Sequence, residues 1–349
     1  MTELLKNTKF LEEEKIYFHS SPASSKLYDS IWTEQNDFQL EDKEIFEQEQ
    51  KKSNERLSRL FSPSSGQQIR FSPGAIALDV CAGHGKYSFS SVDLGSDCVI
   101  MCDGSRKSLS RIGNLVESNK NFQRYKGKIF PVQANIEKIV EAFTPRSFDI
   151  VFQRFAIHHM RNPMKTAHDL ASLVKPGGVL CFNYFAIGCT SQHVRELRSY
   201  FLTKSPEYIR DFFSELEYLK SPNKNDLLRR LISVPDPTKL RFKETSDFLN
   251  CFCEKYGFDV LSRHIHYEDA NTPYVHNIDR LKMENFVTEK LGLYIVDKRD
   301  TADEQSLTLI IPPEGSRILE ENQIPDPKTF SSEDVRLGDN LVQMLELGD

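Results

Sequence analysis

The residues with the clearest chemical potential stand in the heptapeptide 79–85, DVCAGHG. Glycine lets a backbone approach a ligand closely and adopts positive φ without strain. A dinucleotide-binding turn follows the pattern G-x-G-x-x-G, which opens on a glycine after the strand. Here an acid, Asp79, stands at the strand end. Its charge repels a pyrophosphate but suits a ligand that presents an ammonium group. Two glycines alone also fit a tight strand–helix turn that binds nothing.

Further polar residues follow other apolar runs of the chain. Asp103 ends the second run, Asn135 follows the third and Gln153 follows the fourth. Ligands of parallel sheets bind beyond the carboxyl ends of the strands. These side chains are therefore expected at the same edge as Asp79. Asp103 also fits a helix N-cap role, since a helical run begins at Ser105.

Five nearly continuous apolar runs are typical of strands that are buried on both faces. They span residues 75–80, 97–102, 128–133, 148–152 and 179–185. Helix-compatible segments lie between them, for example at 105–118 and 164–173. Strands that alternate with helices through short turns predict a doubly wound, mostly parallel α/β sheet.

The segments around this core differ from it in composition. We expect a flexible N-terminus at residues 1–22 and a helical extension of two helices at 23–73. An α/β domain follows at 74–300, with a helical cap inserted at 186–243, and a tail spans 301–349. The closing strands of the sheet are expected at 258–267 and 291–298, with a helix over 276–290 between them.

Acidic charge is concentrated in residues 301–349, which hold 11 acidic and 3 basic residues. The whole chain carries a net charge of −6, which leaves +2 for residues 1–300. High charge and several prolines predict a solvated, partly disordered tail. A partner-binding arm is the alternative. Removal of residues 316–349 is therefore expected to leave ligand binding unchanged.

The composition is that of an ordinary globular protein, with 349 residues, 39% hydrophobic and 28% charged. No apolar run reaches the ~18–20 residues of a membrane helix, and the first residues lack the order of a signal peptide. Seven cysteines without a CxxC pair indicate a reducing compartment and no structural zinc. His264, His266 and Glu268 alternate, but no further strong ligand adjoins them. We expect a cytoplasmic protein with no metal site and no membrane partner.

Five segments together resemble the motifs of the class I S-adenosyl-L-methionine-dependent methyltransferases. They are LDVCAGHGKYS (78–88), CVIMCDGS (98–105), VQANI (132–136), FDIVFQRFAIHHM (148–160) and LVKPGGVL (173–180). Cys81 stands where the first motif usually has glycine, and Asn135 stands where the third usually has aspartate. The resemblance covers about residues 74–185. It implies a seven-stranded, Rossmann-like sheet, methyl transfer, and S-adenosyl-L-methionine as the cofactor.

The resemblance also implies which residues hold the cofactor. Asp79 would meet the methionine ammonium, and Asp103 would accept the ribose hydroxyls. Asn135 and Ile136 would flank the adenine, and the backbone at Gln153 would face the methionine end. The full set is Asp79, Cys81, Ala82, Gly83, Gly85, Asp103, Gly104, Asn135, Ile136 and Gln153.

Catalytic candidates lie beyond the strand ends. Transfer from a sulfonium needs alignment of the two reacting centres, and it needs a base only when the nucleophile carries a proton of high pKa. His158 is a candidate base, because a neutral imidazole accepts a proton near pH 7. Tyr184 is a candidate for orienting or deprotonating the acceptor. Both also fit structural roles, at a helix start and in the core. Tyr28 belongs to an N-terminal segment that similar enzymes fold over the cofactor.

Three functions fit these features. The first is methyl transfer to an O, N or C nucleophile of a small molecule, held under the helical cap 186–243. The second is methylation of RNA (a cap-like guanine or a tRNA), suggested by a distant similarity of residues 153–158 to cap guanine methyltransferases. The third is a non-catalytic protein that binds S-adenosylmethionine. The nearly neutral body lacks the dense basic stripe that phosphate binding favours, so a small-molecule acceptor is preferred.

Overall fold

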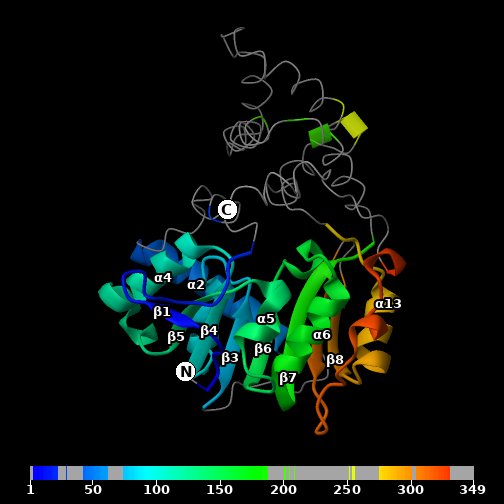
Figure 1. Ribbon diagram of the computed structural model, residues 1–349. Coiled ribbons are helices and arrows are strands. Elements are labelled where there is room, and N and C mark those ends of the chain that lie inside the picture. The colour runs from blue at the N-terminus through cyan, green and yellow to red at the C-terminus, as the bar shows by residue number, and fades with distance from the viewer. Residues whose placement is uncertain are drawn as a thin grey trace.

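The computed structural model describes five stretches of the chain and several single positions. The stretches are residues 3–22, 42–61, 74–187, 275–300 and 304–330. The single positions are Asp29, Tyr200, Phe201, Lys204, Tyr208, Cys251, Glu254 and Lys255. In the described part, one twisted sheet runs through the molecule with helices on both of its faces (Figure 1).

The sheet has nine strands in the order β1-β2-β5-β4-β3-β6-β7-β9-β8. Their bounds are β1 Lys9–Leu11, β2 Ile16–Phe18, β3 Ile76–Val80, β4 Cys98–Asp103, β5 Ile129–Gln133, β6 Phe148–Gln153, β7 Val174–Phe185, β8 Tyr294–Asp300 and β9 Glu304–Ile310. The pairs from β2 to β7 are parallel, whereas β1 and β9 are antiparallel to their neighbours. The predicted doubly wound, mostly parallel α/β sheet is confirmed, with nine strands in place of the expected seven.

Helices cover both faces of this sheet and explain why its central strands are mostly apolar. One face carries α2 Lys43–Leu60, α3 Lys86–Asp93 and α4 Arg106–Ser118. The other carries α5 Ile139–Ala142, α6 Pro163–Leu173, α13 Arg280–Asn285 and the π-helix η4 Phe286–Lys290. Short 3₁₀ turns are η1 Lys120–Tyr125, η2 Ile136–Lys138, η3 Ile157–His159, η5 Glu321–Gln323 and η6 Pro327–Thr329. Successive strand residues alternate between the two cores, so no position of the central strands is free for a polar surface residue.

Local sequence signals set the helix starts. The Asp42 side chain accepts hydrogen bonds from the backbone of Glu44 and Ile45 and caps α2. Ser105 caps α4 in the same way by accepting from Ser108 N–H (3.2 Å). The helix predicted over 105–118 therefore begins one residue later, because Ser105 is its N-cap.

The N-terminal segment is structured, unlike the flexible N-terminus that the composition predicts. β1 and β2 form a hairpin, and β2 pairs in parallel with β5 at the sheet edge. Ile16 is fully buried, and Glu14 forms an ion pair with Arg106 of α4. β1, β2 and β9 are not among the seven expected strands, and the strand expected at 258–267 lies outside the described residues.

The closing strands also differ from the prediction. The expected strand 291–298 overlaps β8, but β8 begins at Tyr294. β9 lies inside the segment expected to be an acidic tail, and it pairs with β7 on one side and β8 on the other. Leu307 and Leu309 are fully buried. The sheet therefore extends past the expected domain boundary at residue 300.

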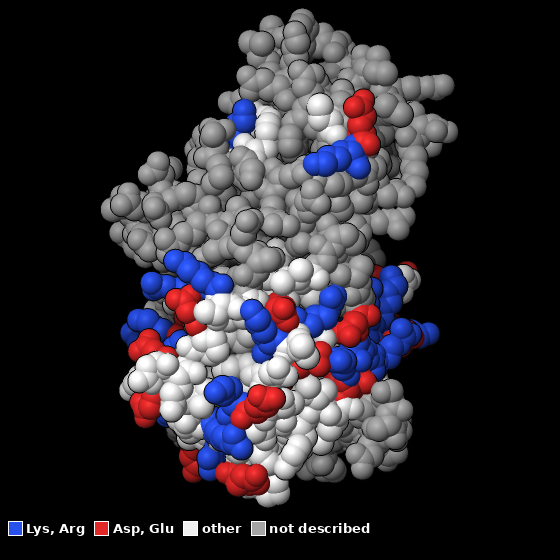
Figure 2. Space-filling model, turned by 90° about the vertical axis from the view of Figure 1, so that its right-hand side faces the viewer, with Lys and Arg blue, Asp and Glu red and all other residues white. Residues whose placement is uncertain are grey.

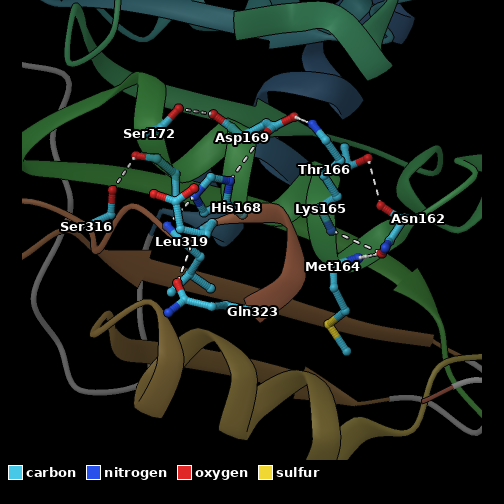
Figure 3. Close-up of polar contacts among 12 residues, drawn as sticks. Asn162, Met164, Lys165, Thr166, His168, Asp169, Ser172, Ser316, Leu319 and Gln323 are labelled. Atoms are coloured by element: carbon cyan, nitrogen blue, oxygen red, sulfur yellow. Dashed lines mark hydrogen bonds and ion pairs between the residues drawn. The ribbon is translucent and has the colours of Figure 1, made fainter. Parts of the chain in front are cut away.

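Residues 316–330, which we call the C-terminal strap, pack against α6. His168 lies at the centre of this contact (Figure 3). Its Nε2 accepts a hydrogen bond from Leu319 N–H (3.1 Å), so the ring proton is on Nδ1, which donates to Asp169 Oδ1 (2.9 Å). Lys165 Nζ contacts the other carboxylate oxygen of Asp169 at 2.5 Å.

Further contacts fasten both ends of the strap. Ser316 Oγ donates to the carbonyl of Ala171 (3.3 Å), and Asn162 Nδ2 donates to the carbonyl of Pro325 (3.2 Å). Phe330 is 2% exposed. The expectation of a solvated tail is therefore wrong for residues 316–330.

Several predicted features lie outside the described residues. They are the first helix of the extension, most of the insertion 186–243, the strand expected at 258–267, Tyr28, and the residues after 330. Among the helices that the structure does describe, none combines the length and the apolar character that crossing a membrane requires.

Candidate functional site

The turn after β3 has the backbone conformation that its sequence suggests. Gly83 and Gly85 have φ angles of 53° and 72°, and Cys81 has 57°. Cys81 thus stands in the left-handed region, where glycine is favoured. A Cβ on Gly85 would lie 2.9 Å from the Met101 sulfur. Gly85 is therefore favoured by its positive φ and by its close approach to Met101, whether or not a ligand is present. Burial raises the pKa of Cys81 well above its usual value, so its sulfur remains a thiol.

Asp79 points from β3 toward α3. It is 2% exposed, and Ser88 Oγ of α3 donates to its Oδ2 (2.6 Å). Burial, and to a lesser extent the nearby charge of Asp103, raise the pKa of Asp79 from 3.8 to about 7, while the charge of Arg154 lowers it. The hydrogen bond from Ser88 acts in the opposite direction. An acid so placed gains from a cationic ligand more than an exposed acid would.

Asp103, at the end of β4, connects two of the loops at this edge. Its Oδ2 accepts from Gly83 N–H and its Oδ1 from Ser105 N–H, both at 2.8 Å. Burial raises its pKa, while these backbone hydrogen bonds oppose the rise. Each carboxylate oxygen retains a second lone pair, so the side chain can still accept hydroxyl hydrogen bonds. Asp103 can therefore anchor the start of the helix and also accept hydrogen bonds from a ligand.

The edge beyond β5 is shared with the N-terminal segment. Asn135 caps the turn η2 by accepting from Glu137 N–H (3.0 Å), and its own N–H donates to Ser20 Oγ (3.2 Å). Gln133 Nε2 donates to Ser21 Oγ and to the carbonyl of Gly104, both at 3.0 Å. The serines were not found from sequence, because a polar turn after a short edge strand gives no distinctive pattern.

Ile136, Ala82 and Gly104 complete the predicted cofactor set at this edge. Ile136 is 9% exposed and packs in the core beneath β5. Ala82 N–H donates to the carbonyl of Cys102 (3.1 Å), which places the turn directly against β4. The structure thus brings together the predicted residues from β3, β4 and β5.

Asp29 is described although Tyr28 is not. Its Oδ1 accepts from Ser105 Oγ (2.8 Å) and from Lys107 N–H (2.9 Å). Asp29 therefore lies at the start of α4, close enough to Asp103 for its charge to raise the pKa of that acid.

Gln153 ends β6 and His158 lies in the turn after it, and the side chains of both are buried without polar partners in the described part. Gln153 is 0% exposed, and neither its amide oxygen nor its amide nitrogen has a hydrogen-bond partner in the described part. His158 is 1% exposed and stacks on Phe185, with ring centroids 3.9 Å apart. Burial lowers the pKa of His158 well below its usual value, and the charges of His159 and His276 lower it further. The imidazole is thus neutral at pH 7.

Tyr184 is held in the sheet. It is fully buried, and its hydroxyl donates to Gln305 Oε1 of β9. The amide of Gln305 donates in turn to Glu284 (2.8 Å) and Asp300 (2.7 Å). Burial raises the pKa of the Tyr184 hydroxyl, and both acids add to this effect. This geometry favours a structural role for Tyr184 over proton transfer.

Arg154 and Asn183 were not among the predicted site residues. The Arg154 guanidinium lies over the rings of Tyr87 and Phe155, at 5.2 and 4.8 Å from their centroids. Asn183 Oδ1 accepts from Phe155 N–H (2.6 Å), and Phe155 has a positive φ of 56°. The sequence signal was an arginine directly after a buried strand, but sequence does not show whether such a cation has an acidic partner.

Comparison with known proteins identifies the core of the chain. A family model described as "Methyltransferase domain" matches residues 78–182, the span from β3 to β7 that contains Asp79, Asp103 and Gln153. Residues 78–182 therefore carry a methyltransferase domain. The cofactor of this domain is S-adenosylmethionine. No curated protein matches the chain.

Solved structures resemble the methyltransferase domain only distantly. An S-adenosylmethionine-dependent methyltransferase from Mesorhizobium loti is 20% identical, with 33% of this chain and 48% of that one covered and a TM-score of 0.28. Magnesium protoporphyrin IX methyltransferase from Synechocystis PCC 6803 is 11% identical, with 75% of this chain and 82% of that one covered and a TM-score of 0.40. Phosphoethanolamine N-methyltransferase 2 from Haemonchus contortus is 19% identical, with 75% of this chain and 52% of that one covered and a TM-score of 0.36. The chain spans about half the length of the first and third, and similarity at this level says nothing of its substrate.

The residues of the methyltransferase domain fit the cofactor chemically. Asp79 and Asp103 supply buried carboxylates at one sheet edge, and Gln153 supplies a buried amide without a protein partner. An amide in this state is costly unless a ligand or water satisfies it. The described residues contain no cluster of three metal-ligand side chains. His264, His266 and Glu268 lie outside them.

Proposed function

We propose that this protein transfers a methyl group from S-adenosylmethionine to an O, N or C nucleophile of a small molecule. The observation that carries the proposal is the meeting of Asp79 and Asp103 at the turn after β3, inside a matched methyltransferase domain. One acid suits an ammonium group, and the other can accept hydroxyls.

The proposed roles follow the position of each residue along the sheet edge. Asp79 holds the methionine ammonium, and the backbone of 81–85 passes beneath the methionine moiety. Asp103 and Gly104 hold the ribose, while Asn135 and Ile136 border the adenine. Gln153 directs its amide to the methionine end, which would satisfy the polar atoms that otherwise have no partner.

The bound cofactor supplies an activated methyl group, so the protein chiefly aligns the acceptor with it. His158 is neutral and can accept a proton, but its ring is buried against Phe185. It serves as a base only if the acceptor reaches beneath the strand end. Tyr184 is committed to Gln305 and is not proposed as a base.

The charge distribution supports a small-molecule acceptor over RNA. On the face shown in Figure 2, basic and acidic side chains of the described residues are interspersed, and no large area has one sign. Non-specific binding of nucleic acid depends on clustered Lys and Arg. Among the described residues of the insertion, Phe201 is fully buried and the hydroxyls of Tyr200 and Tyr208 lie 2.7 Å apart. This aromatic group suits a cap with its own core.

Labelled S-adenosylmethionine incubated with purified protein and an extract of the source cells tests the proposal. The label is expected in the small-molecule fraction, with or without nuclease treatment. Label in nuclease-sensitive material would instead identify an RNA methyltransferase. Binding of the cofactor by calorimetry without any transfer would identify a non-catalytic binding protein.

A further inference from the structure

On the α3 side of the sheet, at its carboxyl edge, two nitrogen donors have no acceptor among the described residues. They are Arg154 Nε and Asn183 Nδ2, and both atoms are buried. Phe152 of β6 pairs with Cys181 of β7, and both pack in the core on the α3 side. Asn183 lies two residues later in β7, on the same face, and Arg154 directly follows β6 with its guanidinium over Tyr87 of α3 on that side. The two donors thus lie on one side of the sheet at its carboxyl end.

The cation of Arg154 is fixed in place but not neutralised. Its guanidinium lies between contacts to Tyr87 and Phe155, and the Lys86 ammonium lies 5.5 Å from the same Tyr87 ring. Aromatic faces orient a guanidinium but carry no net charge. In the part of the chain that the structure describes, neither cation is within ion-pairing distance of a carboxylate. The charge of Arg154 lowers the pKa of Asp79, but the two groups form no ion pair. An oriented cation that touches no carboxylate, beside an unsatisfied amide donor, is suited to an oxyanion.

A carboxylate, which would bind a cationic group, lies nearby on the same face of the sheet. Asp79 of β3 is in register with Phe152, and it contacts Ser88 of the helix that carries Tyr87. The edge therefore offers a carboxylate and a guanidinium that do not pair with each other. A zwitterion with separate ammonium and carboxylate groups complements such an arrangement.

We propose that Arg154 and the Asn183 amide form an oxyanion-binding site, supported by Lys86. The proposal rests on the proposed function, since its first occupant is the carboxylate at the amino-acid end of S-adenosylmethionine. The same chemistry would accept the carboxylate or phosphate of an acidic methyl acceptor. The cofactor and the acceptor would use the same nitrogen donors, and the experiments below distinguish between them.

Calorimetry with two ligands tests the cofactor as the source. S-adenosylmethionine and decarboxylated S-adenosylmethionine differ in the carboxylate alone. Arg154→Gln is expected to weaken the first by roughly 10- to 100-fold, the range for loss of a charged hydrogen bond, and to leave the second unchanged. Arg154→Lys keeps the charge without the planar fork and should recover only part of the loss. Arg124→Gln is the matched control. Arg124 also lies over a tyrosine ring, 4.7 Å from the centroid of Tyr125, but it belongs to η1 and not to the proposed site.

A second arm tests the acceptor as the source. Inorganic phosphate is titrated into each protein saturated with S-adenosylhomocysteine. Phosphate binding that Arg154→Gln abolishes, with unchanged cofactor affinity, assigns the site to the acceptor and supports the proposal. Arg154→Gln protein that binds both cofactors and phosphate like wild type overturns it. Folded wild-type protein that binds no S-adenosylmethionine contradicts the proposed function instead, and the phosphate arm still tests the site.

Discussion

At the scale of single residues, the site depends on buried carboxylates that a bound ligand contacts. Asp79 is almost completely buried with one hydroxyl partner, and its pKa of about 7 means that it is half protonated at neutral pH in the empty protein. Burial makes the carboxylate expensive, and a cationic ligand would offset that cost.

The affinity for S-adenosylmethionine should therefore depend on pH. The ligand ammonium favours the ionised form of Asp79, so affinity is expected to increase from pH 6 to pH 8 and to level off above the pKa of about 7. Calorimetry across this range in a low-salt buffer measures it. Asp79→Asn should bind weakly with no such slope; a slope that persists in this variant would point to a different titrating group.

The same residue predicts a conflict between stability and binding. The folded-state pKa of Asp79 is raised above 3.8, so its contribution to stability is fully present below that value and is lost as pH rises to about 7. Asp79→Asn should hence unfold at a higher temperature than wild type at pH 8, and at a similar temperature near pH 4. Glu117→Gln, on an exposed site of α4, is the charge-matched control. Equal melting temperatures at pH 8 would argue that Asp79 is not strained by burial.

Asp103 is predicted to act on both ligand and loop. Asp103→Ala should weaken cofactor binding by about 1–3 kcal/mol, since a charged acceptor for hydroxyls is lost. It also removes the acceptor of Gly83 N–H and Ser105 N–H. Asp103→Asn, which keeps one oxygen, should retain more of the fold than of the affinity. Unchanged binding in both variants would leave Asp103 as a loop and helix anchor.

At the scale of elements, predictability from sequence follows burial. β3, β4 and β6 are buried on both faces, so their apolar runs marked them clearly, and the acids at the ends of β3 and β4 marked the site. β1 and β2 have three residues each and lie at an edge, where no such run is required. β9 was assigned to a tail because the surrounding charge outweighed its short apolar run. Arg154 and Tyr184 show the remaining limit, because pairing partners such as Gln305 are set by the fold.

The C-terminal strap makes a testable contribution to stability. Phe330 is buried, and its carbonyl accepts from Asp279 N–H (2.9 Å) at the start of α13. Phe330→Ala should lower the free energy of unfolding by about 3–5 kcal/mol, the usual cost of such a truncation in a core. Chemical denaturation measures it, with the exposed Lys328→Ala as a control expected within about 0.5 kcal/mol of wild type. A loss no larger than the control's would show that the strap is only loosely attached.

At the scale of the whole molecule, the domain is completed by segments far from its motifs. The matched family region ends at residue 182, yet β9 and the strap add the last strand contacts and cover α6. A chain that ends at Phe330 is expected to remain folded and to bind S-adenosylmethionine. A chain that ends at Gly315 is expected to lose soluble expression or to melt earlier. Soluble expression and thermal melting compare the two, and equal behaviour would contradict the role given to the strap.

The position of β9 between β7 and β8 has a consequence for synthesis. As the chain leaves the ribosome, β7 is complete by residue 185, but its antiparallel partner spans residues 304–310. For more than a hundred residues of translation, one side of β7 is therefore an open edge, a template for unwanted pairing with other chains. We expect the nascent chain to depend on chaperones for this reason, and its yield in cells to depend on how fast the last strand arrives.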